Sequence, residues 1–353
     1  MRKNTRQNLL EKATLTRSEI IDLLSLSDAS ECKQLFQRAD AVRKQYCGDE
    51  IHLRGIIEFS NFCRRNCDYC GLRRSNSNLP RYRLQPDEII ITATEIAQLG
   101  IQTVVLQSGE DRFYTAELVA EIISSIKQRA KIAITLSLGE RSFSDYLLWF
   151  QAGADRYLLK HETINPELYR QVHSDMNYQE RLRCLSDLKT IGYQVGAGNM
   201  IGLPGQTTAD IADDILFLQT FAADMAGIGP FIPNPDTPLA EATAGNVMQT
   251  LITLAVARIV LKNTHLPTTT ALATLAKDGR KLGLRCGANV IMANFTPLPY
   301  RQFYQIYPGK VTSGQTSAEI ANYWRHFIHQ VGRTIATNRG DSLKTNQSHN
   351  GQY

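Results

Sequence analysis

Strand-like and helix-like segments alternate along most of this chain, and this pattern constrains the fold most strongly. The strand-like segments are short apolar runs at residues 56–59, 103–107, 132–138, 156–159, 194–201, 225–229, 268–272 and 289–292. Segments with helical spacing of apolar residues follow them at residues 86–99, 115–127, 142–151, 178–191, 207–221, 247–262, 275–282 and 317–331. Continuous apolar strands that alternate with helices indicate a parallel sheet. The repetition predicts an α/β fold of the closed (β/α)8 TIM-barrel type, and an open doubly wound sheet is the alternative.

The ends of the chain differ from this repeat. Thr16 and Glu19 form a capping-box pattern before residues 20–26, and residues 30–46 carry apolar side chains at helical spacing. The last residues are polar, a composition typical of disorder. We therefore expect three regions, a helical extension over residues 1–50, the barrel over residues 51–331 and a disordered tail over residues 332–353.

Three cysteines follow the first predicted strand with the spacing C-x3-C-x2-C. Cys63, Cys67 and Cys70 lie within a few residues of loop, so one metal centre can bind all three thiolates. A structural zinc ion usually has four protein ligands, and a 4Fe–4S cluster normally has four cysteines. Three cysteines on such a cluster leave one iron open to another ligand. The alternative is a zinc site whose fourth ligand, His161 or Cys286, comes from far along the chain.

The other cysteines and the absence of long apolar segments indicate a reducing compartment. Cys32, Cys47, Cys184 and Cys286 are isolated in the sequence, so each is expected to be a packed residue and not a ligand. No run of about 18 uncharged apolar residues occurs. The basic start of the chain lacks the apolar part of a signal peptide. We expect a cytoplasmic protein with no membrane segment.

The net charge of +5 comes partly from arginines around the cysteines. They are Arg64, Arg65, Arg73, Arg74, Arg81 and Arg83. A basic patch can bind nucleic acid, but few aromatic side chains are interleaved here. The pattern therefore favours a positive rim around an anionic cluster and its cofactor, with no nucleic-acid partner. Solvated surface charge is the alternative for Arg73 and Arg74.

Polar residues lie at or near the ends of the predicted strands, where barrel enzymes hold their active sites. They include Gln107, Ser108, Thr135, Ser137, Glu162, Thr269 and Thr270. Threonine also favours strands, so a purely structural role is the alternative for each threonine. Glu162 is expected to accept a hydrogen bond from a ribose or amino group, and Arg181 to bind a carboxylate. Residues 196–202 are glycine-rich but precede Pro204, which argues against a dinucleotide site.

The cysteine motif, with Tyr69 before its last cysteine, resembles the signature of the radical S-adenosylmethionine (SAM) superfamily. Longer segments are similar to the branch of that superfamily that contains the FeFe-hydrogenase maturases, methylornithine synthase and biotin synthase. They are residues 69–74, 105–111, 135–140, 153–159, 161–163, 227–233, 235–239 and 285–292, followed by Tyr300, Tyr304 and Tyr307. The resemblance extends over residues 51–310, which is most of the chain.

This resemblance implies a complete barrel around a long cavity that holds one 4Fe–4S cluster and SAM. It assigns the cluster to Cys63, Cys67 and Cys70, and SAM contacts to Tyr69, Ser137, Glu162, Arg181, Met292 and Tyr304. It assigns substrate contacts to Gln107, Ser108, Thr135, Arg156, Thr269, Thr270 and Tyr307. The implied reaction is reductive cleavage of SAM to a 5′-deoxyadenosyl radical during assembly of a hydrogenase di-iron centre. The implied partners are a small organometallic or amino-acid-derived substrate, a reductant such as ferredoxin or flavodoxin, and other hydrogenase maturases.

The sequence departs from this branch at a few positions. Residues 309–317 lack the further cysteines with which some relatives bind an accessory cluster, so a single cluster is expected. Lys160 stands where an arginine is expected and Ala293 where a proline is expected, which leaves the substrate open. A mutase of the methylornithine synthase type is the alternative enzyme. An iron–sulfur scaffold or carrier is the alternative that is not an enzyme.

Overall fold

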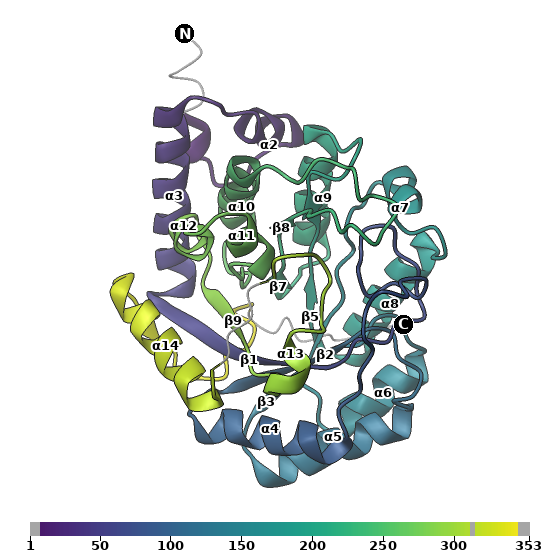
Figure 1. The fold of residues 1–353 in the computed structure, drawn as a ribbon. Coiled ribbons are helices and arrows are strands. Elements are labelled where there is room, and N and C mark those ends of the chain that lie inside the picture. Colours follow the sequence, from purple (N-terminus) through teal and green to yellow (C-terminus); the bar gives the residue numbers. More distant parts are fainter. Residues whose placement is uncertain (1–7, 311–314, 345–353) are drawn as a thin grey trace, which may run out of the picture.

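The computed structural model describes residues 8–310 and 315–344 and has a curled parallel sheet at its centre (Figure 1). The strand order is β10-β1-β2-β3-β4-β5-β7, and β9 also pairs with β1. These strands are β1 (Glu50–Ser60), β2 (Thr103–Ser108), β3 (Ala133–Ser137), β4 (Arg156–Leu158), β5 (Gln194–Ala197), β7 (Met225–Ala226), β9 (Val290–Asn294) and β10 (Thr334–Ile335). Two further strands, β6 (Met200–Ile201) and β8 (Gly229–Pro230), pair with each other beyond the ends of β5 and β7.

A short extended segment between β7 and β9 closes the barrel. Met225 forms a parallel bridge with His265, and Pro267 forms one with Val290. Because β9 pairs in turn with β1, these bridges complete the ring. The predicted (β/α)8 barrel is therefore confirmed, with its seventh strand reduced to two bridges.

The predicted strand at residues 268–272 is wrong. The extended backbone ends at Thr269, and α11 (Thr270–Leu275) begins directly after it. Thr269 Oγ1 accepts a hydrogen bond from the amide of Leu272 at 3.3 Å, which caps the new helix. A threonine run favours strands by propensity, but a threonine hydroxyl that caps a helix favours the helix start instead.

Helices surround the barrel (Figure 1). They are α4 (Pro86–Gln98), α5 (Ala116–Arg129), α6 (Phe143–Gln151), α7 (Pro166–Val172), α8 (Tyr178–Ile191), α9 (Thr208–Thr220), α10 (Val247–Leu261), α12 (Gly279–Arg285), α13 (Leu298–Arg301) and α14 (Ser317–Gln330). Side-chain caps fix several starts, as where Ser142 Oγ accepts from the amide of Asp145 at 3.1 Å. None of the helices in the described ranges is long and apolar enough to cross a membrane.

The N-terminal helices pack on the barrel wall. α2 (Arg17–Leu24) contacts α9 and α10, and α3 (Ala29–Cys47) contacts α10 and α12. As a result α10 is covered on both sides, and every residue from Thr250 to Leu261 is buried. The capping box of Thr16 and Glu19 is present at the start of α2, as the sequence pattern predicted. The helices of the N-terminal extension therefore belong to the same hydrophobic core as the barrel.

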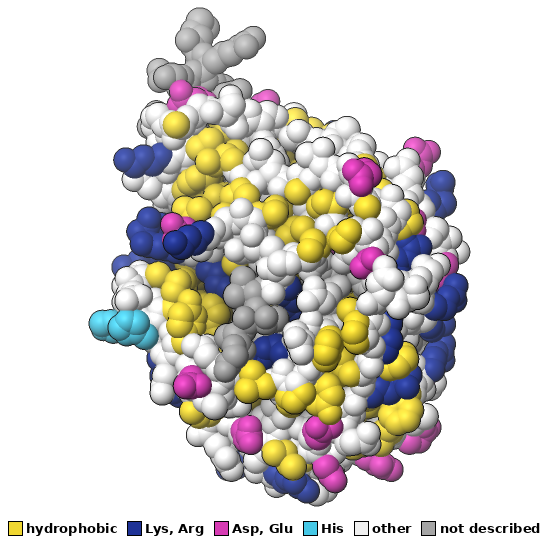
Figure 2. Space-filling model, in the orientation of Figure 1, with side chains coloured by type: hydrophobic (Ala, Val, Ile, Leu, Met, Phe, Trp, Pro, Cys, Tyr) yellow, Lys and Arg dark blue, Asp and Glu magenta, His cyan; other side chains and the backbone are white. Residues whose placement is uncertain are grey.

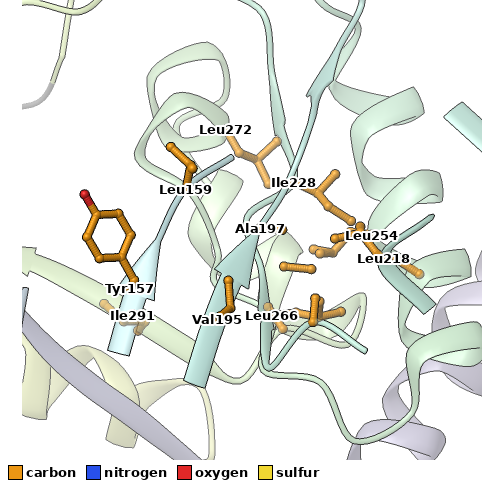
Figure 3. Close-up of a cluster of buried hydrophobic side chains, with 14 of the residues drawn as sticks. Tyr157, Leu159, Val195, Ala197, Leu218, Ile228, Leu254, Leu266, Leu272 and Ile291 are labelled. Carbon is orange, nitrogen blue, oxygen red and sulfur yellow. The ribbon is translucent and has the colours of Figure 1, made fainter. Parts of the chain in front are cut away.

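The apolar core lies between the strands and the helices outside them (Figure 3). Val195 and Ala197 of β5 are fully buried near Leu218 of α9 and Leu254 of α10. Burying one such leucine or valine side chain stabilises a fold by about 1.5–3 kcal/mol. This layer holds α9 and α10 against the sheet and so fixes the ends of β5 and β7.

The segment after α14 covers the N-terminal end of the barrel. β10 pairs in parallel with the first residues of β1. Beyond it, Arg156 donates hydrogen bonds to the backbone oxygen of Arg339 and to the Asp341 carboxylate, each at 2.7 Å. Arg54 donates to the backbone oxygen of Gly340 at 3.2 Å, and His265 Nε2 lies 3.0 Å from the backbone oxygen of Asp341.

The expectation of a disordered tail over residues 332–353 is therefore wrong for residues 332–344. The polar composition favours solvation. However, buried basic groups at the strand starts need hydrogen-bond acceptors, and this segment provides them. Residues 345–353 lie outside the described residues.

Candidate active site

A cavity of about 390 Å³ opens at the C-terminal ends of the barrel strands. β1 contributes Glu58, β2 contributes Gln107 and Ser108, and β3 contributes Ser137, each at or near the last residue of its strand. The loop after β1 contributes all three cysteines of the motif. The cavity thus lies where barrel geometry places active sites.

Buried side chains fix the loop that carries the cysteines. Asn61 is fully buried and donates from Nδ2 to the backbone oxygens of Pro80 and Phe303, at 2.8 Å each. The Arg81 guanidinium donates to four backbone oxygens of the loop, those of Asn61, Leu72, Arg73 and Asn76. These bonds satisfy carbonyl groups that no helix or sheet ladder pairs. The loop therefore holds the cysteines in place without regular secondary structure.

The three thiols face the cavity and lie close enough to influence one another. Burial, together with the Cys63 thiol, raises the pKa of Cys70 to about 12. Burial and both neighbouring thiols raise the pKa of Cys67 well above its usual value. The amides of Arg65 and Glu110 donate to Cys63 Sγ at 3.4 Å. A bound metal removes the protons from such thiols, and amide donors stabilise the resulting thiolates.

The donor set suits a polynuclear cluster and not a single zinc ion. In residues 8–310 and 315–344, no group of three Cys, His, Asp or Glu side chains is placed to hold one metal ion. His161 lies outside the cavity, with Nε2 3.3 Å from the buried Asp214 carboxylate. Cys286 is buried at the end of α12, away from the cavity lining. In the described part of the chain, neither of the two candidate fourth ligands of the zinc alternative therefore lines the cavity that holds the cysteines.

Two buried glutamates connect the cysteine loop to Arg181. Glu110 accepts hydrogen bonds from Arg64 Nε at 2.9 Å and from Arg65 Nε at 2.7 Å. Glu140 accepts from Arg65 Nη2 at 2.6 Å and from Arg181 Nε at 2.8 Å. Both carboxylates are nearly inaccessible to solvent, so these charge-assisted bonds are strong and directional. They hold the Arg181 guanidinium at the cavity wall.

Glu162 is held in an unusual backbone conformation beside the cavity. Its φ is 65°, in the left-handed region that residues other than glycine rarely adopt. The carboxylate accepts a hydrogen bond from Lys160 Nζ at 2.8 Å. Burial alone would raise the pKa of Glu162, but Lys160 and its other basic neighbours, including Arg181, together outweigh burial and lower the pKa below its usual value. The cavity thus contains a charged carboxylate that can accept hydrogen bonds from a ligand.

Tyr69 rests against a neutral histidine that the sequence did not single out. Burial lowers the pKa of His173 to about 3, so its imidazole is uncharged near neutral pH. His173 Nδ1 lies 3.1 Å from the backbone oxygen of Tyr169, which requires Nδ1 to carry the proton. Nε2 then accepts the hydroxyl proton of Tyr69 at 3.1 Å. This bond orients the ring that precedes Cys70.

Basic side chains gather on the outer side of the cysteine loop. In Figure 2, Lys and Arg are concentrated along the right-hand edge, over the region where Figure 1 shows α6 to α8. The loop contacts this region, because the amide of Asp68 donates to the backbone oxygen of Val172 at the end of α7. Arg74 and Arg112 are exposed and lie near Arg64 of the cysteine loop, which fits a positive rim. Arg73 is buried and donates to Ser75 Oγ at 2.9 Å, so it is not solvated surface charge.

The cavity brings together most of the side chains that the sequence predicted. They are Cys63, Cys67, Tyr69, Cys70, Gln107, Ser108, Ser137, Glu162, Arg181, Thr269, Thr270, Met292, Tyr304 and Tyr307. Two of them contact each other, since Gln107 Nε2 lies 3.3 Å from Tyr304 Oη. This proximity fits a shared site, and the role of each residue toward a ligand stays a prediction.

Two predicted substrate residues, Thr135 and Arg156, lie elsewhere. Both line a very small cavity at the opposite end of the barrel. Arg156 is the first residue of β4, so its side chain reaches Thr103 Oγ1 at 3.0 Å and the Asp341 carboxylate. Thr135 pairs with Arg156 in the middle of β3. Neither residue lines the large cavity, because the start of β4 and the middle of β3 lie below the strand ends that form it. Their role toward a substrate stays a prediction.

The sequence reasoning missed a buried ion pair deep in the cavity. Lys310 Nζ contacts the Glu58 carboxylate, and both side chains are almost fully buried. Asn294 Nδ2 donates to the other oxygen of Glu58 at 2.8 Å. A glutamate inside an apolar strand indicates a buried charge that has a partner. The partner, Lys310, is far away in the sequence, so the spacing of residues could not identify it.

Comparison with known proteins places these features in a family. The radical SAM superfamily matches residues 57–218. The chain is 52% identical over 302 residues to the [FeFe] hydrogenase maturase subunit HydE of Thermotoga maritima, with 86% of each chain covered.

Solved structures agree in fold. The crystal structure of methylornithine synthase (PylB) is similar with a TM-score of 0.84 and 25% identity, over 94% of this chain and 97% of that chain. The structure of the FeFe-hydrogenase maturase HydG from Carboxydothermus hydrogenoformans has a TM-score of 0.76 and 22% identity, over 91% of this chain and 77% of that chain. The chain belongs to the radical SAM superfamily and, within it, to the family of the [FeFe] hydrogenase maturase HydE.

Proposed function

We propose that this radical SAM enzyme acts in maturation of FeFe-hydrogenase, as a protein of the HydE type. The observation that carries the proposal is the convergence of three cysteine thiols on a cavity lined by Glu162 and Arg181. The likeness to the Thermotoga maritima maturase over most of both chains supports the same conclusion.

Members of this superfamily bind a 4Fe–4S cluster and SAM, and we assign the cluster to Cys63, Cys67 and Cys70. When bound, the cluster supplies the electron that cleaves SAM to a 5′-deoxyadenosyl radical. The residues around it position the ligands. The amides of Arg65 and Glu110 stabilise the Cys63 thiolate, and Arg81 keeps the loop closed around the site. A single cluster follows from the absence of further cysteines after Tyr307.

We assign SAM to the part of the cavity next to the cysteines. Arg181 is fixed by Glu140 through Nε and is suited to pair with the carboxylate of the methionine group. The charged Glu162 carboxylate is suited to accept hydrogen bonds from a ribose or an ammonium group. The remaining proposed contacts are Tyr69, Ser137, Met292 and Tyr304, all of which line the same cavity.

The substrate is assigned to the deeper part of the same cavity. Its proposed contacts are Gln107, Ser108, Thr269, Thr270 and Tyr307, to which the structure adds Lys160 and Lys310. Hydroxyl, amide and ammonium donors dominate this group, so a small anion is favoured there. A small organometallic or amino-acid-derived precursor of a hydrogenase di-iron centre has that character.

A ferredoxin or flavodoxin is the proposed reductant, and other hydrogenase maturases are proposed partners. The exposed arginines beside the cysteine loop are complementary to an acidic electron donor. A cytoplasmic location and the absence of a nucleic-acid partner complete the proposal.

A second enzymatic candidate is an amino-acid mutase, favoured by the similarity in fold to methylornithine synthase. Such an enzyme needs a clamp for the amino and carboxylate groups of its substrate. Arg156, which would have been the clearest candidate for that clamp, points to the other end of the barrel. The mutase is therefore the weaker candidate, and an iron–sulfur carrier does not explain a cavity lined by Glu162 and Arg181 beside the cysteines.

The test is formation of 5′-deoxyadenosine by the anaerobically reconstituted and reduced protein. We expect the wild type and a Cys32→Ala control to form it, because Cys32 is buried in α3, away from the cavity. Cys67→Ala should form none. A wild type that retains iron but forms no 5′-deoxyadenosine would favour the carrier. Isomerisation of added lysine would favour the mutase over the maturase.

A further inference from the structure

A second cavity, of about 380 Å³, lies beside the active site between the barrel wall and the helices α12 and α14. Both cavities are lined by Ile56, Glu58, Thr270, Met292 and Lys310, so the two adjoin each other at these side chains. We call the second cavity the side chamber. Its own walls include Arg280, Ile320, Tyr323, Trp324 and Phe327.

Arg280 brings a positive charge into the side chamber without an acidic partner. Its guanidinium donates to the backbone oxygen of Thr268 and to Thr270 Oγ1, both at 3.3 Å. Burial lowers the pKa of Arg280 to about 10, and only tyrosines act against burial. In the ranges that the structure describes, no carboxylate forms an ion pair with it. A partly buried guanidinium with two weak neutral acceptors retains capacity for an anion.

The wall opposite this charge is aromatic. Arg280 Cζ lies 4.7 Å from the centre of the Trp324 ring, in cation–π contact. Tyr323 and Phe327 of α14 extend the same surface. A ligand with an apolar or planar part can lie on this surface while its charged group reaches Arg280.

The charges around the side chamber favour an anion. Lys277 and Lys281 are exposed at its edge and face one carboxylate there, that of Asp278. Lys310 and Glu58 neutralise each other at the boundary with the active site. Arg301 also lines the chamber and donates to the backbone oxygen of Thr296 at 2.9 Å. In the part of the chain that the structure describes, Arg280 therefore adds positive charge inside the chamber, and the lysines at the edge attract anions from solvent.

We propose that the side chamber binds a small organic anion, with its charged group on Arg280 and its apolar part on Trp324. Because the chamber adjoins the active-site cavity at Glu58 and Lys310, a ligand held there is one side-chain movement away from the substrate position. The inference concerns the side chamber alone and does not depend on which reaction the active site performs.

Tryptophan fluorescence tests the proposal, because the chain has two tryptophans and they differ in access. Trp149 is fully buried in the core, whereas Trp324 borders the side chamber. We expect the anionic quencher iodide to quench Trp324 more strongly than neutral acrylamide does. Saturating benzenesulfonate should compete with iodide and so reduce the quenching of Trp324 by iodide. Arg280→Gln should raise the dissociation constant of benzenesulfonate about tenfold, because one charge-assisted contact is lost.

Matched variants separate charge from structure. Arg280→Lys should keep part of the iodide preference, while acrylamide quenching should be the same in all variants. Arg325→Gln is the control, because Arg325 is next to Trp324 in sequence but donates to the backbone oxygen of Leu99 outside the chamber. Equal benzenesulfonate affinity in the wild type and Arg280→Gln would overturn the proposal. The same loss in Arg325→Gln, or no difference between Arg280→Lys and Arg280→Gln, would also overturn it.

Discussion

At the scale of single residues, Glu140 connects the cysteine loop to Arg181 in α8. Its carboxylate accepts hydrogen bonds from Arg65 in the cysteine loop and from Arg181 in α8. Because the carboxylate is almost fully buried, water cannot easily replace either arginine as its hydrogen-bond donor, and breaking either bond is costly. The position of the proposed carboxylate-binding group is thereby tied to the position of the cluster ligands.

Replacement of Arg181 should weaken SAM binding without removing the cluster. Arg181→Gln deletes the charge proposed to pair with the methionine carboxylate, so we expect the dissociation constant of SAM to rise about tenfold to a hundredfold. Iron content should stay at the wild-type value, since Arg181 is not a ligand. Calorimetric titration of the anaerobic protein with SAM measures the change.

Arg183→Gln is the control for this prediction. Arg183 lies on the same helix but is partly exposed and pairs with Glu180 and Asp187. Its replacement should leave SAM affinity unchanged. An Arg181→Gln protein with wild-type SAM affinity would show that the carboxylate binds elsewhere.

The sequence predicted candidate residues well where the family motif and the strand ends coincided. The cysteines, Glu162 and Tyr304 belong to loops or strand ends, and the structure gathers them in one cavity. Arg156 lies outside that cavity because a side chain at a strand start belongs to the other end of the barrel, and its role toward a substrate stays a prediction. His173 was missed because its role comes from a contact with Tyr69 that no local pattern encodes.

At the scale of elements, a close approach between β2 and the cysteine loop shapes the site. A Cβ atom on Gly109 would lie 2.2 Å from the backbone oxygen of Phe62 and 2.8 Å from Cys63 Cβ. Neither neighbour can move without displacing the first cysteine. The turn after β2 therefore requires glycine for steric reasons, although the φ of Gly109 is ordinary.

Gly109→Ala should reduce cluster loading. The added methyl group pushes Cys63 away from the other thiols, so we expect iron content after reconstitution to fall to less than about half of the wild-type value. Gly227→Ala is the matched control, because a Cβ there meets its nearest atom at 3.7 Å. Full iron loading in Gly109→Ala would contradict the proposed position of the cluster.

The C-terminal segment, residues 332–344, is where the structure differs most from what the sequence composition predicts. Its polar composition predicts disorder, yet residues 334–335 pair with β1 and residues 339–341 accept hydrogen bonds from buried arginines. The eight-fold repeat was predicted because each helix and strand has a local pattern. A segment without such a pattern acquires structure only from its tertiary partners, which the sequence alone does not reveal.

Asp341→Asn should destabilise the fold while leaving the active site intact. Arg156 is almost fully buried and loses its charged partner, so we expect the free energy of unfolding to fall by about 1–3 kcal/mol. Urea unfolding measures this change. Asp213→Asn removes an exposed partner of Arg17 and should leave stability close to the wild-type value. Equal effects of the two substitutions would contradict the structural role of the segment.

At the scale of the whole molecule, the strand starts collect positive charge away from the active site. His52 and His265 lie edge to face at 4.9 Å, beside Arg54 and Arg156, and Asp341 is the nearby carboxylate. Burial and the arginines lower the pKa of His52 to about 4 and the pKa of His265 well below its usual value. Both histidines are therefore neutral in the folded protein at neutral pH.

Acidification should destabilise the protein through these histidines. The unfolded chain binds protons at histidine near pH 6.5, whereas folded His52 does so only near pH 4. Between these values the free energy of unfolding should fall with decreasing pH by about 1.4 kcal/mol per pH unit for each such histidine. Urea unfolding of His52→Gln should show a smaller pH dependence than the wild type. An unchanged slope would contradict the burial of a neutral His52.

The central claim is that the molecule holds a cluster on three thiolates and leaves one iron for SAM. Electron paramagnetic resonance of the anaerobically reconstituted, reduced protein tests it most directly. The account predicts a reduced 4Fe–4S signal whose shape changes when SAM is added, and loss of the signal in Cys67→Ala. A signal that ignores SAM, or bound zinc with four protein ligands in place of a cluster, would contradict it.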